Sequence, residues 1–96
     1  MDLVQMANLT KGMTIEKWRL VPVELVEVSV VKLIGDALSV EALLNAAHDG
    51  PSKNGDPFPH LVSIQHSLWA EDGLHRIMVW RIRGCGLMPM RVLRLE

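Results

Sequence analysis

The residues best suited to metal chemistry in this sequence are its four histidines, His48, His60, His66 and His75. On one extended strand, His60 and His66 would stand about 20 Å apart, because each residue advances the chain by about 3.3 Å. His66 and His75 fall on opposite faces of the hairpin expected here, or about 13 Å apart in the alternative register. Ligands of one ion must lie about 2 Å from it, so we expect no metal site.

Nucleophilic and cofactor chemistry also lack the residues they need. Cys85 lies between two glycines, but no family signature surrounds it, and a reactive thiol requires a partner that lowers its pKa. The segment 50–55 has the spacing of a phosphate-binding loop but lacks the following Lys and Ser or Thr. The segment 84–89 begins like a dinucleotide fingerprint, yet Pro89 replaces its third glycine. We therefore expect no catalytic residue and no cofactor.

The arginines near the C-terminus give the one strong charge signal. From residue 74 to residue 95 the chain contains no acidic residue and five arginines, Arg76, Arg81, Arg83, Arg91 and Arg94. Arginine makes bidentate contacts with carboxylates and phosphates and is enriched at protein interfaces. Three interpretations stay open: pairing with the protein's own glutamates, a surface for a partner protein, or a surface for nucleic acid.

The elements that must position these residues follow from the hydrophobic pattern. A loop rich in glycine and proline, residues 48–59, divides the chain. Residues 36–48 predict a helix with Asp36 or Ser39 as its N-cap. Its expected buried stripe contains Leu38 or Val40, Leu43, Leu44 and Ala47. Residues 20–34 are rich in valine and predict one bulged strand or two strands, with a helix starting at Pro22 as the alternative.

The part after the loop predicts a β-hairpin. Residues 61–69 and 74–83 alternate apolar and polar side chains, and Glu71, Asp72 and Gly73 would form the turn between them. This register buries Trp80 opposite Ile64. The outer face of this C-terminal hairpin then carries Trp69, His75, Arg81 and Arg83. Residues 87–96 predict a further strand, with Pro89 at a sheet edge or near the strand start, and a short helix beginning at Pro89 is the alternative.

Length and composition limit the domain number and the fold class of the chain. We expect the 96 residues to form a single domain, 1–96. With 49% hydrophobic and 22% charged residues the chain is not disordered, and its single cysteine excludes a disulfide framework. The predicted fold class is α+β: a small antiparallel β-sheet of about four or five strands with one main α-helix packed on one face, in two layers.

Function is predicted largely by exclusion. A net charge of −1 gives no general attraction to nucleic acid or membrane, and neither a signal peptide nor a membrane span is visible, so we expect a cytoplasmic protein. We expect a small non-enzymatic protein-binding module, a regulator, an inhibitor or a self-associating subunit, acting through Trp69, His75, Arg81 and Arg83 and forming a homodimer. The alternatives are nucleic-acid binding through the arginine segment, and a ligand-binding domain or enzyme whose site forms in the fold.

Overall fold

The computed structural model describes residues 1–35, 38–48 and 55–95 of the chain. Its strands are β1 (Val23–Glu27), β2 (Val31–Lys32), β3 (His60–Ile64), β4 (Ser67–Asp72) and β5 (Leu87–Arg94). Its helices are α1 (Leu3–Leu9), α2 (Ile15–Trp18), the 3-10 turn η1 (Val28–Val30), α3 (Val40–Ala47) and α4 (Leu74–Ile82). The sequence patterns assigned no element to residues 1–18, where α1 and α2 lie.

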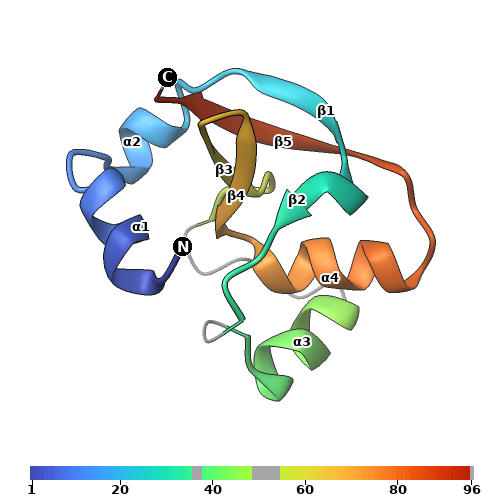
Figure 1. Ribbon diagram of the computed structural model, residues 1–96. Coiled ribbons are helices and arrows are strands. Elements are labelled where there is room, and N and C mark those ends of the chain that lie inside the picture. The colour runs from blue at the N-terminus through green and yellow to red at the C-terminus, as the bar shows by residue number, and fades with distance from the viewer. Residues whose placement is uncertain (36–37, 49–54, 96) are drawn as a thin grey trace.

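The strands form one sheet in the order β1-β5-β3-β4-β2 (Figure 1). The predicted α+β class and the number of strands are confirmed. The sheet is mixed, however, and not antiparallel as expected. β1 and β5 pair antiparallel, as do β3 and β4, whereas β3 and β5 are parallel and so are β2 and β4.

Residues 20–34 form two strands, which is one of the two predicted strand arrangements. The 3-10 turn η1 separates them and lets the chain cross the sheet, so that β1 and β2 lie at its opposite edges. Val26, Val28 and Val31 are buried on the way. The restricted χ1 rotamers of these β-branched valines favour the two strands.

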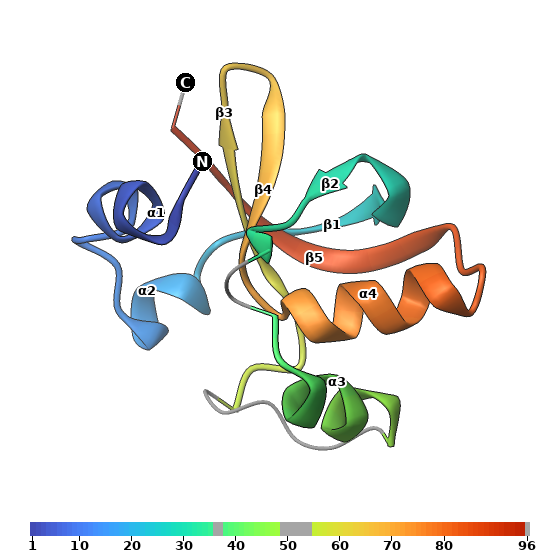
Figure 2. The ribbon, with the colours of Figure 1, turned by 60° about the horizontal axis from the view of Figure 1, so that its bottom comes forward.

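The helix predicted over 36–48 is present as α3, with Ser39 as its N-cap accepting a hydrogen bond from the Ala42 N–H at 3.2 Å. Asp36, the alternative cap, lies outside the described residues. The predicted buried stripe is partly wrong: Leu38, Leu43 and Ala47 are half-buried, but Leu44 is 56% exposed and Val40, the alternative to Leu38, is 75% exposed. α3 packs on the outer side of α4, away from the sheet (Figure 2).

The predicted hairpin register is also wrong. The turn lies at Gln65 and His66, whose positive φ angles of 51° and 62° suit a two-residue turn between twisted strands. No glycine marks this turn in the sequence. Residues 74–82 are helical, and Trp80 lies half-buried on α4 instead of opposite Ile64. The main helix packed on the sheet is therefore α4, whose Leu74 and Ile77 recur at helical spacing.

Gly73 makes the direct passage from β4 into α4 possible. Its φ of 83° is in the left-handed region, where glycine is favoured. A Cβ atom placed on it would lie 2.7 Å from Cβ of Pro59. The chain thus turns sharply here and brings the end of β4 against the residues that precede β3.

The sheet separates two groups of buried side chains. Leu61 and Val62 are consecutive in β3 and point to opposite faces. The α4-side core contains Val26, Val28, Val31, Leu61, Ala70, Leu74, Ile77, Met88, Met90 and Val92. The α2-side core contains Met6, Trp18, Val21, Ile34 and Val62, with Trp69 and Leu93 packed against it. Helices thus cover both faces.

The C-terminal strand is confirmed as β5. It is an interior strand, with β1 on one side and β3 on the other. Pro89 sits near its start, as predicted. β3 joins β5 from Arg91 onward, so the missing N–H of Pro89 costs no bond to β3.

Candidate functional site

The structure separates the four residues predicted to share one face. Trp69, on β4, is half-buried against the α2-side core, with the Lys32 Nζ 5.5 Å from its ring centre. His75, Arg81 and Arg83 belong to the α4 segment. The common sheet face is therefore wrong, because residues 74–82 are helical. Whether these residues contact a partner stays a prediction.

Three of the four bind the protein's own backbone. His75 Nε2 accepts the Ser39 N–H at 2.9 Å, and the Arg83 guanidinium donates to the Ala47 carbonyl at 2.8 Å, so both tie α4 to the ends of α3. Arg81 donates to the carbonyls of Val28 and Val31. These contacts join α4 to its neighbours.

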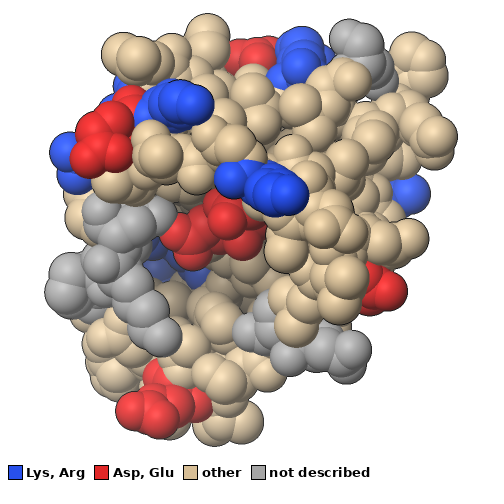
Figure 3. Space-filling view, turned by 90° about the vertical axis from the view of Figure 1, so that its left-hand side faces the viewer, with Lys and Arg blue, Asp and Glu red and all other residues tan. Residues whose placement is uncertain are grey.

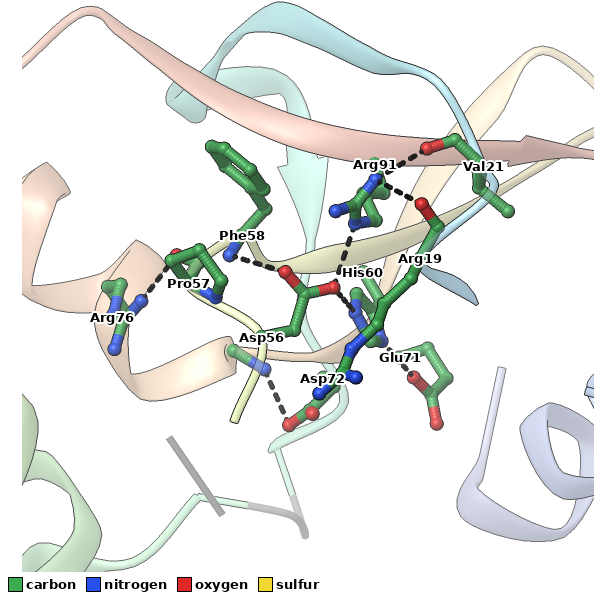
Figure 4. Close-up of polar contacts among 11 residues, drawn as sticks. Arg19, Val21, Asp56, Pro57, Phe58, His60, Glu71, Asp72, Arg76 and Arg91 are labelled. Carbon is green, nitrogen blue, oxygen red and sulfur yellow. Dashed lines mark hydrogen bonds and ion pairs between the residues drawn. The ribbon is translucent and has the colours of Figure 1, made fainter. Parts of the chain in front are cut away.

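A buried polar cluster lies where β3 begins and β4 ends (Figure 4). At its centre is His60, which is 1% exposed, with its Nε2 2.7 Å from Oδ2 of Asp56. Its ring stacks on Trp18, with 4.4 Å between ring centres and 9° between planes. Its Nδ1 lies 3.6 Å from Oε2 of Glu71. Stacking and hydrogen bonding together fix the position of the imidazole.

Asp56 connects this histidine to β5. The Arg91 Nε donates to Asp56 Oδ2 at 2.8 Å, and the Phe58 N–H donates to Oδ1 at 3.2 Å. Arg91 also donates to the carbonyls of Arg19 and Val21, which fixes the chain between α2 and β1. A charged network of this kind is costly to bury unless every member is paired.

The cluster shifts the proton affinities of its two most buried members. Burial opposes ionisation of Asp56, but hydrogen bonds from His60, Arg91 and the Phe58 N–H outweigh it and hold the pKa of Asp56 below its ordinary value. Burial likewise opposes a charge on His60. The carboxylates of Glu71 and Asp56 outweigh that effect and raise the pKa of His60.

Sequence analysis missed this cluster. Asp56 and His60 are four residues apart in the chain, but Glu71 and Arg91 approach them through the pairing of β3 with β4 and β5. In the space-filling view of the side that carries α1, acidic atoms line the upper edge of a hollow and basic atoms lie just above them (Figure 3). The available signal was a histidine directly after Pro59 at the start of an apolar run.

A second feature is the open sheet face, which we define as Val23, Leu25, Leu87 and Pro89. These residues lie on neighbouring positions of β1 and β5, with Leu25 opposite Pro89. Leu25 is 69% exposed and Leu87 is 56% exposed. β1 ends the sheet, and in the part of the chain that the structure describes no strand pairs with its outer side. The apolar side chains here have no cover from α1 or α2.

A groove of about 490 Å³ lies where α2, the start of β1 and the end of β5 meet. It is lined by Met13, Leu20, Val21, Pro22 and Leu93, with Lys17, Glu24 and Arg94 at its sides. Leu20 is 84% exposed.

Among the described residues, the structure contains no helix that could span a lipid bilayer.

Residues 7–96 match the model of a protein family described as antitoxin VapB-like. No curated protein matches the chain.

Proposed function

We propose that this chain, which belongs to the VapB-like antitoxin family, inhibits a toxin by binding it as a protein partner. The family agrees with the regulator or inhibitor class predicted from the sequence. The finer proposal is that the partner binds at the outer edge of β1 and the open sheet face. As expected from the sequence, we place the protein in the cytoplasm.

The observation that carries this proposal is the exposure of Leu25 in the middle of an edge strand. An edge strand offers unpaired N–H and C=O groups, and exposed apolar side chains beside them favour the addition of a strand from another chain. Glu27, opposite Leu87, lies on the same face of β1 as Leu25, whereas the Glu24 carboxylate pairs with Arg94 at 2.8 Å on the opposite face. The groove beside Leu20 extends the apolar area that a partner would cover.

The arginine contacts favour a protein over nucleic acid as the partner. Each of the five C-terminal arginines donates within the chain. Arg76 binds the Pro57 carbonyl and Arg94 binds Glu24, while Arg81, Arg83 and Arg91 make the contacts described above. Guanidinium groups used in this way contribute less to a phosphate-binding surface.

Self-association is the alternative occupant of the same face. The predicted homodimer would bury Leu25 and Leu87 against a second copy, through the strand at the sheet edge. The set Trp69, His75, Arg81 and Arg83 stays a second predicted contact surface. A test must therefore distinguish a toxin, a second copy and the α4 surface.

The proposed test compares the wild-type chain with Leu25→Glu. Each is used to capture proteins from nuclease-treated lysate of the native host, and every captured protein is then expressed alone and together with each variant. We expect one captured protein to arrest growth, wild type to restore growth, and Leu25→Glu to fail. Val40→Glu, on exposed α3, is the matched control and should behave as wild type.

Three results would contradict the proposal. Full rescue of growth by Leu25→Glu would place the toxin contact elsewhere. Capture that occurs from untreated lysate but is lost from the nuclease-treated lysate would favour nucleic acid. Loss of capture in Arg83→Ala with normal capture by Leu25→Glu would favour the α4 surface.

A further inference from the structure

The end of the β3–β4 hairpin brings together three side chains of metal-ligating type. One ligand atom each of His60, Glu71 and Asp72 lies within 4.8 Å of the other two. The strand register explains the arrangement, since His60 pairs with Asp72 but Leu61 pairs with Ala70, which leaves Glu71 as the extra residue of a β-bulge. A bulge re-aims side chains locally, and here it turns two consecutive carboxylates toward one histidine.

His60 is held as a metal-binding histidine is held. Its Nε2–H donates to the ionised Asp56 carboxylate, so Nδ1, which faces Glu71, is the nitrogen that would give up its proton and offer its lone pair to an entering ion. A histidine that binds a metal almost always donates its other ring N–H to a carboxylate or carbonyl, which fixes its tautomer and orientation. Asp56 is held in turn by Arg91, and Trp18 fixes the plane of the ring. The residues that hold the imidazole in place are therefore different from Glu71 and Asp72.

We propose that Nδ1 of His60 and the carboxylates of Glu71 and Asp72 bind a divalent transition-metal ion, with zinc as the best fit. Zinc accepts both imidazole and carboxylate ligands at about 2.0–2.2 Å, in tetrahedral geometry that sets ligand atoms roughly 3.4 Å apart. The 3.6 Å between His60 and Glu71 is already close to that spacing. No separation between the three ligand atoms exceeds 4.8 Å, so a shift of at most about 1.4 Å between side chains closes the site.

A positively charged side chain near the site, that of Arg19, would oppose binding of the ion. The Arg91 charge is directed to Asp56, and a guanidinium nitrogen of Arg19 lies 3.7 Å from the Cβ position of Gly55, the residue before Asp56. Arg19 is exposed, so its guanidinium can move away when an ion enters. A like charge next to the ion opposes binding. Arg19→Gln should therefore strengthen metal binding, whereas a role of Arg19 in building the site would make the same variant weaken it.

The experiment is a titration of the chelator-treated chain with zinc, followed by calorimetry and by the thermal unfolding midpoint. We expect one ion per chain and a rise in Tm that saturates, since a ligand that binds the folded state stabilises it. Glu71→Gln and Asp72→Asn should each weaken binding at least tenfold, and Arg19→Gln should strengthen it severalfold. Magnesium, which binds imidazole poorly, should leave Tm unchanged.

Matched controls are available at exposed positions. His66→Gln, in the β3–β4 turn, and Glu24→Gln, in the surface pair with Arg94, should bind zinc as wild type does. X-ray absorption of the zinc complex should show one nitrogen and at least two oxygen ligands. The proposal is overturned if wild type does not bind zinc below 1 mM, if the Glu71→Gln/Asp72→Asn double variant binds normally, or if His66→Gln abolishes binding.

Discussion

Asp56 is the residue whose replacement tests the buried cluster most directly. Its carboxylate is 1% exposed and accepts bonds from His60, Arg91 and the Phe58 N–H. Asp56→Asn keeps the size of the side chain and one acceptor oxygen, but removes the charge and places an N–H₂ group against a donor. We therefore expect unfolding to become easier.

The magnitude follows from what each partner loses. A hydrogen bond to a charged group contributes about 1.5–3 kcal/mol. Arg91 keeps its bonds to the carbonyls of Arg19 and Val21, so most of the loss falls on His60. We expect Asp56→Asn to lower the free energy of unfolding by about 2 kcal/mol. Asp56→Ala, which leaves a buried charge without its partner, should lower it by about 3–5 kcal/mol.

Urea unfolding at neutral pH measures this difference, with the slope m expected to stay unchanged. Glu24→Gln is the control, because the Glu24–Arg94 pair is exposed and should contribute less than about 1 kcal/mol. If Asp56→Asn unfolds at the wild-type urea concentration, the buried cluster does not stabilise the fold and the reasoning fails.

Further predictions concern pH, the β4–α4 junction, the arginines and self-association. Because the pKa of His60 is raised, its contribution to stability is full below its unfolded pKa of about 6.5 and is lost as pH rises through the folded value. Because the pKa of Asp56 is lowered, its contribution is lost as pH falls through the folded value. The urea midpoint should thus fall at acid pH, where Asp56 is protonated, and also at higher pH, where His60 loses its proton. A midpoint that does not change with pH contradicts the assigned shifts. Gly73→Ala should lower the free energy of unfolding by at least about 1 kcal/mol, whereas Gly12→Ala, with open space around it, should not. Arg81→Ala should cost about 2 kcal/mol and the exposed Arg83→Ala under about 1 kcal/mol, and equal urea midpoints would refute the inward role of Arg81. Light scattering at high micromolar concentration should give a dimer that Leu25→Glu converts to a monomer, and a wild-type monomer would exclude the homodimer.

The sequence by itself determined the features that depend on local chemistry. Valine-rich residues 20–34 favoured strands over the alternative helix, and β1 and β2 form there, because β-branched side chains fit a pleated surface. α3 begins at Ser39 because its hydroxyl accepts an amide proton of the first turn. The exclusion of a disulfide framework required no more than counting cysteines.

The tertiary structure decided the conformation of segments that the sequence pattern did not predict correctly. The alternating pattern of residues 74–82 predicted a strand, but Gly73, which closely approaches Pro59, directs the chain into the helix α4. The Gln65–His66 turn had no glycine to announce it.

The cluster around His60 depended on tertiary structure for a further reason. The β3–β4 bulge and the pairing of β3 with β5 bring Glu71 and Arg91 to it from distant parts of the chain, and a one-residue shift in strand register would place these side chains on the other face of the sheet.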